Sequence, residues 1–403
     1  MDPFWRKCFE SLGRPGASEL VANGPGNFFV THKGVKEKLE APRMGLDSYI
    51  QLIRENLVNL VESELPFDPK GGYIFEGHYK VPAEFGGYEG RCHIALSPIG
   101  QVPYITLTKI AASTNTLESI AASGSMSTEM LNFLTMAVRH KLTIVLSGQS
   151  GAGKTTTLQA LTRFFSEQDR IGVGEDVPEL KLIQPNTFYL HTLPWRPGLD
   201  PNLVADLSFV VKQFLRMRPD RIIIGETRGK EFADFLVATN SGMDGSLTTI
   251  HANDPHSALD KMTRFALQGS EKQPIRSVNK EIGTAVDLVV QLARIEGKHR
   301  ITHIQEITDT VSNSDDAKLS SATLYEYDPV NDNWRKPNMM TDRLQKELTL
   351  RGANLKPFLA NGTGTVLTKH VSQQAPPQAD VNLGGNFSQR PGNPFSGGSG
   401  RAI

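Results

Sequence analysis

Apolar residues follow two alternating patterns between residues 136 and 330. Apolar residues recur at helical spacing over 155–165, 204–215, 231–238 and 258–267. Between these stretches lie short apolar runs typical of buried strands, at 142–146, 170–174, 188–191, 221–225, 245–251, 288–292 and 300–307. Strands that alternate with helices are typical of a parallel sheet with helices on both of its faces. The pattern therefore predicts an α/β domain over residues 136–330.

The residues before this domain are patterned differently. Residues 1–115 combine helical spacing with separate strand-like runs, which predicts a smaller α+β domain at the N-terminus. The helical spacing lies at 49–60 and the strand-like runs at 28–30, 91–96 and 104–109. Residues 116–135 are helix-prone, and we expect them to link the two domains.

After residue 330 the pattern fades, and residues 331–371 are interpreted as a C-terminal extension. Residues 372–403 are rich in Gly, Pro and Gln and contain almost no large apolar side chains. Such a segment cannot bury enough surface to offset the entropy lost on ordering. We therefore predict a disordered tail over 372–403.

Composition restricts the compartment and the partners. The 403 residues carry 43 basic and 43 acidic side chains, so a strongly basic surface for broad nucleic-acid binding is not expected. Cys8 and Cys92 are the only cysteines in the sequence, which excludes a disulfide framework and a four-cysteine zinc site. The sequence has no apolar run as long as a membrane span and no signal-peptide core at its start. We expect a cytoplasmic protein whose membrane contacts are peripheral.

One stretch of the α/β domain fits a phosphate-binding pattern. Between the run at 142–146 and the helical spacing after it, the chain reads Gly148-Gln149-Ser150-Gly151-Ala152-Gly153-Lys154-Thr155-Thr156. The first eight residues match G-x-x-x-x-G-K-[ST], the P-loop, in the strand–loop–helix context that this pattern requires. Its backbone N–H groups surround a phosphate, Lys154 reaches the β- and γ-phosphates, and Thr155 ligates Mg²⁺. These residues predict binding of a nucleoside triphosphate with Mg²⁺.

Glu226, Glu175 and His251 each stand at the end of a predicted strand. The carboxyl ends of parallel strands meet at the edge of the sheet where ligands bind. We predict that Glu226 activates the attacking water or holds Mg²⁺, that Glu175 orients water, and that His251 senses the γ-phosphate. The alternatives stay open: a surface glutamate, an acid that complements a helix dipole, and a hydrogen-bonded core histidine, respectively.

Arginines are the expected stabilisers of the charge that develops in phosphoryl transfer. Arg91, Arg216, Arg218 and Arg228 lie beside predicted elements, and we take Arg91, Arg218 and Arg228 as catalytic candidates. Ordinary surface salt bridges are the alternative for each of them.

Three further stretches resemble those of the type II/type IV secretion ATPase superfamily. Residues 215–229 read LRMRPDRIIIGETRG and resemble its Walker B region. Residues 241–253 read SGMDGSLTTIHAN and resemble its His box, and residues 175–179 read EDVPE and resemble its Asp box. With the P-loop, four motifs stand in the order of the family, and the resemblance extends over residues 17–330.

The resemblance implies a RecA-like P-loop ATPase domain that hydrolyses ATP with Mg²⁺. Lys154 and Thr155 match the residues for phosphate and metal, Glu226 matches the Walker B acid, Glu175 the Asp-box acid, and His251 the His-box histidine. Arg91 matches an N-terminal-domain arginine that reaches the phosphates. The family also implies a homo-hexamer in the cytoplasm, peripheral at the inner membrane of a bacterium, whose partners are inner-membrane components of a secretion system.

The chain departs from the family pattern at a few positions. Thr108 stands where many relatives carry Arg, and Gly172 and Gly174 stand where bulkier residues are usual. The two cysteines exclude the zinc module of many type II enzymes. Gly229 replaces an Asp usual in pilus-retraction and type II enzymes, and the chain lacks the long N-terminal extension common in tight-adherence ATPases. Together these differences favour the type IV secretion and conjugation branch.

Other functions remain as alternatives. The nearest is a tight-adherence or type IV pilus assembly ATPase. A hexameric nucleic-acid motor shares the P-loop, but its pore loops are basic and aromatic, and direct sequence-specific nucleic-acid binding is not expected here. A small-molecule kinase and a ring that binds ATP without hydrolysing it are the more distant alternatives.

Overall fold

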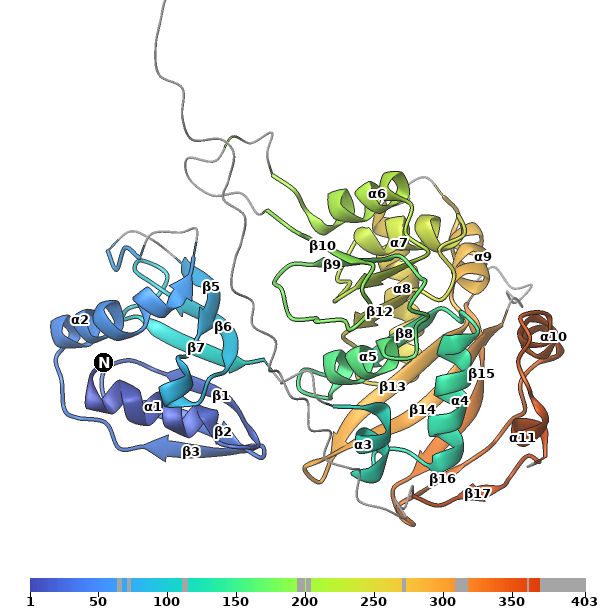
Figure 1. Ribbon diagram of the computed structural model, residues 1–403, viewed down its shortest axis with the longest axis horizontal. Coiled ribbons are helices and arrows are strands. Elements are labelled where there is room, and N and C mark those ends of the chain that lie inside the picture. The colour runs from blue at the N-terminus through green and yellow to red at the C-terminus, as the bar shows by residue number, and fades with distance from the viewer. Residues whose placement is uncertain are drawn as a thin grey trace, which may run out of the picture. The chain divides into compact units, whose positions relative to one another are not determined.

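The computed structural model of the chain describes residues 1–63, 67–70, 74–110, 115–193, 200, 204–269, 273–308, 318–360 and 362–369. The tail predicted at 372–403 lies outside the described residues. The described part forms two sheets, each with its own helices (Figure 1).

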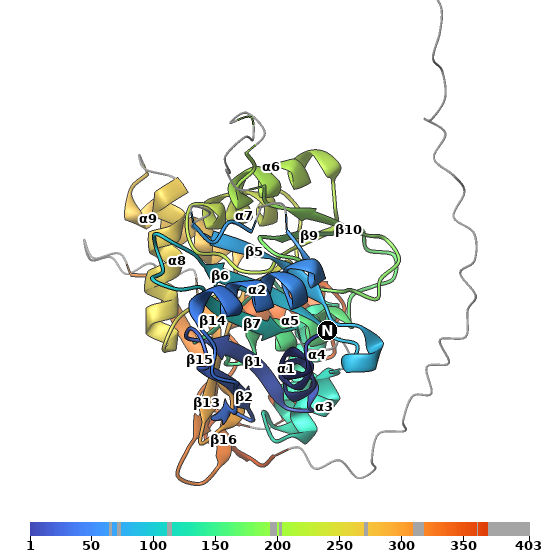
Figure 2. The same ribbon diagram turned by 90° about the vertical axis from the view of Figure 1, so that its left-hand side faces the viewer.

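The N-terminal sheet is antiparallel and has seven strands in the order β3-β2-β1-β7-β6-β5-β4. The strands are β1 (Ala17–Ala22), β2 (Phe28–His32), β3 (Val35–Leu39), β4 (Val61–Glu62), β5 (Ile74–Lys80), β6 (Glu89–Ala95) and β7 (Tyr104–Lys109). Helices α1 (Pro3–Gly13) and α2 (Leu46–Asn56) pack on it, and Figure 2 shows both on the same side of this sheet. Aromatic rings fill the contact, where Phe28 meets Phe4, Trp5 and Tyr49 edge to face. Two short 3₁₀ turns, Val58–Leu60 and Ala83–Phe85, complete the predicted α+β domain, which is confirmed.

The second sheet has ten strands in the order β10-β9-β11-β12-β8-β13-β14-β15-β16-β17. The strands are β8 (Ile144–Gly148), β9 (Ile171–Glu175), β10 (Thr187–His191), β11 (Arg221–Ile224), β12 (Leu247–Ile250), β13 (Leu288–Ile295), β14 (Lys298–Thr308), β15 (Ser320–Asp328), β16 (Asn333–Arg335) and β17 (Val366–Leu367). Neighbours from β10 to β13 are parallel, as predicted. From β13 onward they are antiparallel, so the expectation of a parallel sheet holds for only part of it. The antiparallel part arises because β13 and β14 are joined by a tight turn rather than by a helix.

Helices cover both faces of the parallel part, and the strand residues alternate between them. Ile144 and Leu146 face a core formed with α3 (Leu117–Ala122), α4 (Thr128–Arg139) and α5 (Lys154–Thr162). Val145 faces a core formed with α6 (Leu207–Met217), α7 (Glu231–Thr239), α8 (Pro255–Gly269) and α9 (Ile275–Ala285). Burial on both faces explains why these strands consist mainly of apolar and small residues.

The predicted helical segment at 117–134 is in fact two helices, α3 and α4. Gly124 follows α3 with φ +81°, a left-handed conformation that ends a helix at little cost for glycine. Ser127 begins the next helix, because its side chain accepts the backbone N–H of Met130 at 3.2 Å.

The cap at Ser127 leads to a stability prediction. Ser127 is 1% exposed, so Ser127→Ala leaves the Met130 N–H without its partner, and we expect a loss of about 1 kcal/mol. Ser127→Gly should cost less, only a few tenths of a kcal/mol, because glycine tolerates the cap conformation. Thermal unfolding of the two variants checks this, and equal losses for both would contradict the capping role.

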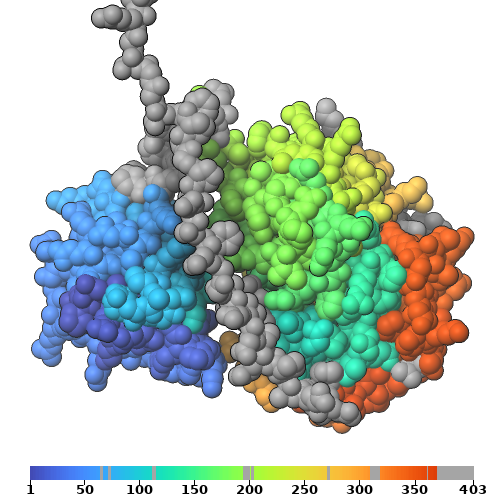
Figure 3. Space-filling view, viewed as in Figure 1, coloured from blue at the N-terminus to red at the C-terminus, as the bar shows by residue number. Residues whose placement is uncertain are grey.

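Residues 333–369 belong to the core of this domain rather than lying apart from it. After β16 they form α10 (Asp342–Leu350), α11 (Lys356–Leu359) and β17. Trp334, Leu344 and Phe358 are buried in the core that includes α4, and the Phe358 ring meets Phe133 of α4 at 5.8 Å. Figure 3 shows these orange and red residues packed against the teal residues of the helical layer. The sequence pattern after residue 330 did not reveal this packing.

Gly172 and Gly174 of β9 leave room for α6. A Cβ at Gly172 would lie 2.9 Å from the Phe214 ring, and one at Gly174 would lie 3.1 Å from a methyl of Val210. The two small residues therefore let α6 approach the sheet closely, which explains why bulkier residues do not fit at these positions.

Among the described residues, no helix combines the length and the apolar character needed to cross a membrane.

Candidate functional site

The P-loop joins β8 to α5 and has the backbone that the glycine pattern predicts. Gly151 and Gly153 take φ values of +71° and +94°, which glycine adopts without strain. Gly148 lies so close to β13 that a Cβ there would be 2.6 Å from the Leu292 carbonyl oxygen. Gly153 then starts α5, so the free N–H groups of the first helical turn lie next to the loop.

The side chain of Lys154 points back into the loop. Its Nζ donates to the carbonyl oxygens of Gly148 at 2.9 Å and Gln149 at 3.0 Å, and to Nδ1 of His251 at 3.3 Å. Lys154 is 7% exposed, and this burial lowers the pKa of its ammonium to about 8. An anion bound in the loop would favour the charged form of Lys154.

The strand order places His251 between the P-loop and Glu226. β12, which His251 follows directly, pairs with β8 on one side and β11 on the other. His251 Nδ1 faces Lys154, and its Nε2 lies 2.8 Å from Glu226 Oε1. Because β12 lies between β8 and β11, the strand that precedes Glu226 is not the neighbour of the strand that precedes the P-loop. His251 therefore connects the predicted phosphate-binding lysine to the predicted catalytic acid.

Glu226 is held in its charged form. Burial opposes the charge, but the hydrogen bond and charge of Arg228, with the charges of His251 and Lys154, outweigh it and lower the pKa of Glu226. Arg228 Nη2 donates to Glu226 Oε2 at 3.0 Å. The other oxygen, Oε1, is buried beside Nε2 of His251 and accepts no well-aligned hydrogen bond within the described residues. Glu226 is thus an ionised carboxylate that lies between Arg228 and His251.

Glu175 has a different environment from the one predicted. It ends β9, is 4% exposed, and its oxygens accept the backbone N–H groups of Glu179 and Leu180 at 3.1 to 3.3 Å. Burial raises the pKa of Glu175 to about 7 despite these hydrogen bonds. The described contacts of Glu175 fix the loop 176–180 that follows β9.

The raised pKa of Glu175 predicts a pH-dependent stability. In the unfolded chain the pKa of this carboxyl is near 4.5, so below pH 4.5 the protonated group makes its whole contribution to the free energy of unfolding. This contribution is lost as the pH rises through the folded-state pKa of about 7. Glu175→Gln cannot titrate, so its Tm relative to wild type should rise by about 2–5 °C between pH 5 and pH 8. Thermal unfolding at several pH values tests this, and a constant difference would contradict it.

Glu179 is a further candidate functional residue, which the sequence motifs did not single out. Arg91 Nη2 of β6 lies 2.6 Å from Glu179 Oε1, so the N-terminal-domain arginine meets the Asp-box loop directly. Burial raises the pKa of Glu179 above its ordinary value, and the charge of Arg91 offsets only part of this increase. The spacing Glu175-x-x-x-Glu179 was visible in the sequence, but nothing in it indicated which acid faces outward.

The arginine candidates separate into two groups. Arg91 and Arg228 contact acids of the site, and Arg228 also approaches Asp176 at 3.8 Å. Arg218 ends α6 in a left-handed conformation, φ +53°, three residues before β11 begins. It therefore lies at the amino end of the parallel strands, opposite the edge that carries the P-loop. The structure does not bring Arg218 to this site within one chain.

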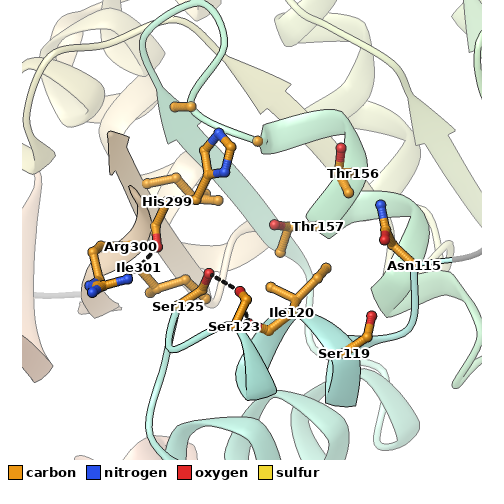
Figure 4. Close-up of a pocket in the computed structure, with 13 residues that line it drawn as sticks. Asn115, Ser119, Ile120, Ser123, Ser125, Thr156, Thr157, His299, Arg300 and Ile301 are labelled. Carbon is orange, nitrogen blue, oxygen red and sulfur yellow. Dashed lines mark hydrogen bonds between the residues drawn. The ribbon is translucent and has the colours of Figure 1, made fainter. Parts of the chain in front are cut away.

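A cavity of about 290 Å³ lies beside the P-loop (Figure 4). It is bounded by the segment around α3, the start of α5, and the β13–β14 hairpin. Polar side chains face it, including Asn115, Ser119, Thr156, His299 and Arg300. No aromatic ring of Phe, Tyr or Trp lines it among the described residues. Its position at the start of α5 and its size suit the nucleoside part of a nucleotide whose phosphates occupy the P-loop.

The residues at this edge fit a magnesium ion. Mg²⁺ prefers oxygen ligands and usually keeps several waters, so one hydroxyl, one carboxylate and a substrate phosphate suffice. Thr155 supplies a hydroxyl at the start of α5. Glu226 supplies the ionised carboxylate.

Comparison with known proteins agrees with this geometry. The family described as type II/IV secretion system protein matches residues 83–369. Two conjugal transfer proteins of Mycobacterium tuberculosis strains are 32% identical over 222 residues, which cover 54% of this chain and 62% of each relative. The conjugal transfer protein TrbB of Rhizobium radiobacter is 29% identical over 251 residues, which cover 62% of this chain and 68% of the relative. The chain thus spans less than two thirds of the first of these relatives.

A solved structure is also similar. The VirB11 ATPase of the Brucella suis type IV secretion system, in complex with sulphate, is 23% identical and covers 75% of this chain and 95% of its own, with a TM-score of 0.39.

Proposed function

Because this chain belongs to the type II/IV secretion system protein family, we propose that it is an ATP-hydrolysing motor of a type IV secretion or conjugation system. The observation that carries the proposal is the connected set Lys154–His251–Glu226–Arg228 at the carboxyl edge of the sheet. The names of the relatives support the conjugation branch.

The proposed reaction is transfer of the γ-phosphoryl group of ATP to water. The loop 148–156 surrounds the phosphates with backbone N–H groups, and Lys154 neutralises charge on them. Glu226 accepts a proton from the attacking water, whose oxygen bonds to the γ-phosphorus as the bond to ADP breaks. The lowered pKa of Glu226 supports this role, because a general base must be ionised before it can take a proton.

Thr155 and Glu226 are proposed to hold Mg²⁺, which when bound neutralises charge that develops on the phosphate oxygens. Arg228 orients Glu226 through the hydrogen bond to Oε2. Glu175 fixes the Asp-box loop through its hydrogen bonds to the backbone, and its role in orienting water stays a prediction.

Arg91 is proposed to exchange partners when ATP binds. In the structure it pairs with Glu179, which is largely buried. A triphosphate is a stronger partner for a guanidinium than one carboxylate is, so Arg91 would turn to the phosphates and free Glu179. The exchange would couple nucleotide binding to the contact between the N-terminal domain and the Asp-box loop.

The assembly proposed is a homo-hexamer, cytoplasmic and peripheral at the inner membrane, that acts on membrane components of the secretion system. Arg218, at the opposite edge of the sheet, is proposed to act across a subunit boundary.

The test combines native mass with ATP turnover, each with and without DNA. We expect a mass about six times the chain mass of 44.3 kDa and turnover that DNA does not change. Turnover stimulated strongly by DNA would instead support a nucleic-acid motor. A monomer that transfers phosphate to a small acceptor would support a kinase.

A further inference from the structure

We propose that His299 is a positioning residue of the P-loop, which holds the Gly151–Ala152 peptide in the orientation that the loop needs to surround a phosphate. The inference rests on the proposed function, since it concerns how the same loop is prepared for a polyphosphate. It assigns a role to a residue that none of the four sequence motifs contains.

The β13–β14 hairpin places His299 over the loop. Glu296 and Gly297 have φ values of +49° and +78°, the pattern of a tight type I′ turn, which fixes the pairing of Ile295 with Lys298. His299 is the next residue of β14 after Lys298. β13 itself runs beside β8, with Leu292 opposite Gly148, so the hairpin extends past the start of the P-loop.

The ring of His299 makes one hydrogen bond to the tip of the loop. Its Nε2 lies 3.0 Å from the carbonyl oxygen of Gly151. A carbonyl oxygen only accepts, so Nε2 must carry the proton and His299 is the donor. Figure 4 shows the ring reaching from the hairpin toward the glycine-rich turn that precedes α5.

This hydrogen bond determines which way the next N–H points. A trans peptide is planar, so its N–H lies opposite its C=O. His299 binds the Gly151 oxygen, and the Ala152 N–H on the other side of the peptide donates to the Gln149 oxygen at 3.2 Å, so the peptide is held from both sides. Loss of the His299 hydrogen bond would let the peptide rotate more freely, and a carbonyl oxygen turned toward the phosphate would repel it.

Packing against neighbouring side chains does not hold the tip of the P-loop at Gly151. A Cβ built on Gly151 meets no atom within 4 Å, so this position lies in open space away from neighbouring side chains. Glycine also has the widest choice of backbone conformations. The donor from His299 is therefore well placed to select one peptide orientation from several.

His299 also borders the space proposed for the nucleoside. A Cβ at Gly153 would lie 3.6 Å from His299 Cδ2, and the ring lines the cavity beside Thr156. A test must therefore separate an effect on phosphate binding from an effect on the nucleoside.

The experiment measures binding of Mg·pyrophosphate and Mg·ADP to the full chain by calorimetry. His299→Leu removes the donor but keeps bulk, and we expect both affinities to fall about three- to tenfold, the value of one neutral hydrogen bond. His299→Gln retains an N–H donor and should restore both to within about twofold of wild type. The matched control is His303→Leu, four residues along the same strand, whose side chain contacts Thr302 and Glu326 rather than the loop.

The outcomes distinguish a role of His299 in phosphate binding from a role in nucleoside binding. Loss of Mg·ADP affinity with unchanged pyrophosphate affinity would overturn the inference, because His299 would then act on the nucleoside. Unchanged affinity for both ligands, or an equal loss in His303→Leu, would also overturn it. If wild type bound neither ligand, the proposed function itself would fail. His299 is exposed, so the variants should unfold within about 2 °C of wild type.

Discussion

Replacing Glu226 with glutamine is expected to slow ATP hydrolysis at least about 100-fold while Mg·ATP still binds within about threefold of the wild-type affinity. Glutamine has nearly the same shape, so Arg228 keeps an oxygen to which it can donate. It cannot accept a proton from water, and general-base catalysis is worth about 10²–10⁴ in rate. The measurement is single-turnover hydrolysis beside equilibrium binding of Mg·ATP.

A matched control tests whether the loss of rate is specific to Glu226. Glu326→Gln changes an exposed acid of β15 and should leave both the rate and the affinity unchanged. If Glu226→Gln hydrolysed ATP at a rate close to wild type, Glu226 would not be the base. If its affinity fell as much as its rate, the residue would act mainly in binding.

Lys154→Met is expected to lower the affinity for Mg·ATP about 100-fold and to leave hydrolysis barely detectable. The ammonium is buried, with 7% of the residue exposed, and it is the positive group that contacts the P-loop carbonyls directly. Charge-assisted hydrogen bonds to phosphate each contribute about 1.5–3 kcal/mol. Titration calorimetry with Mg·ATP measures the loss.

The folded state should tolerate this change, because methionine keeps the length of the buried chain and removes a charge whose burial is costly. The control Lys230→Met removes an exposed ammonium paired with Asp206, and its nucleotide affinity should equal wild type. Unchanged affinity in Lys154→Met would contradict the assignment of the P-loop.

Local features of the fold were predictable from the sequence, because they depend on neighbouring residues. The P-loop is flanked by an apolar strand and a helical spacing, and the structure places it between β8 and α5. The ends of β9, β11 and β12 could also be predicted, since an acid or a histidine follows a short strand-like run in each case.

Long-range pairing was not predictable. Nothing near residue 251 indicates that β12 lies between β8 and β11, yet this order decides that His251 bridges Lys154 and Glu226. The same holds for Glu175 and Glu179, since their different roles depend on backbone N–H groups and on Arg91 from another sheet. α10 and β17 were not predicted because their apolar residues are few and far apart, and they are buried only in the folded core that also includes α4.

Hydrolysis of ATP at the P-loop edge of the sheet is the proposal on which the other predictions depend. The most direct measurement is the rate of phosphate release from ATP by the purified wild-type chain, with Mg²⁺ and after its removal by a chelator. The account predicts steady release with Mg²⁺ that stops when the metal is removed. A chain that binds Mg·ATP and has the native mass of a hexamer, but releases no phosphate, would contradict it.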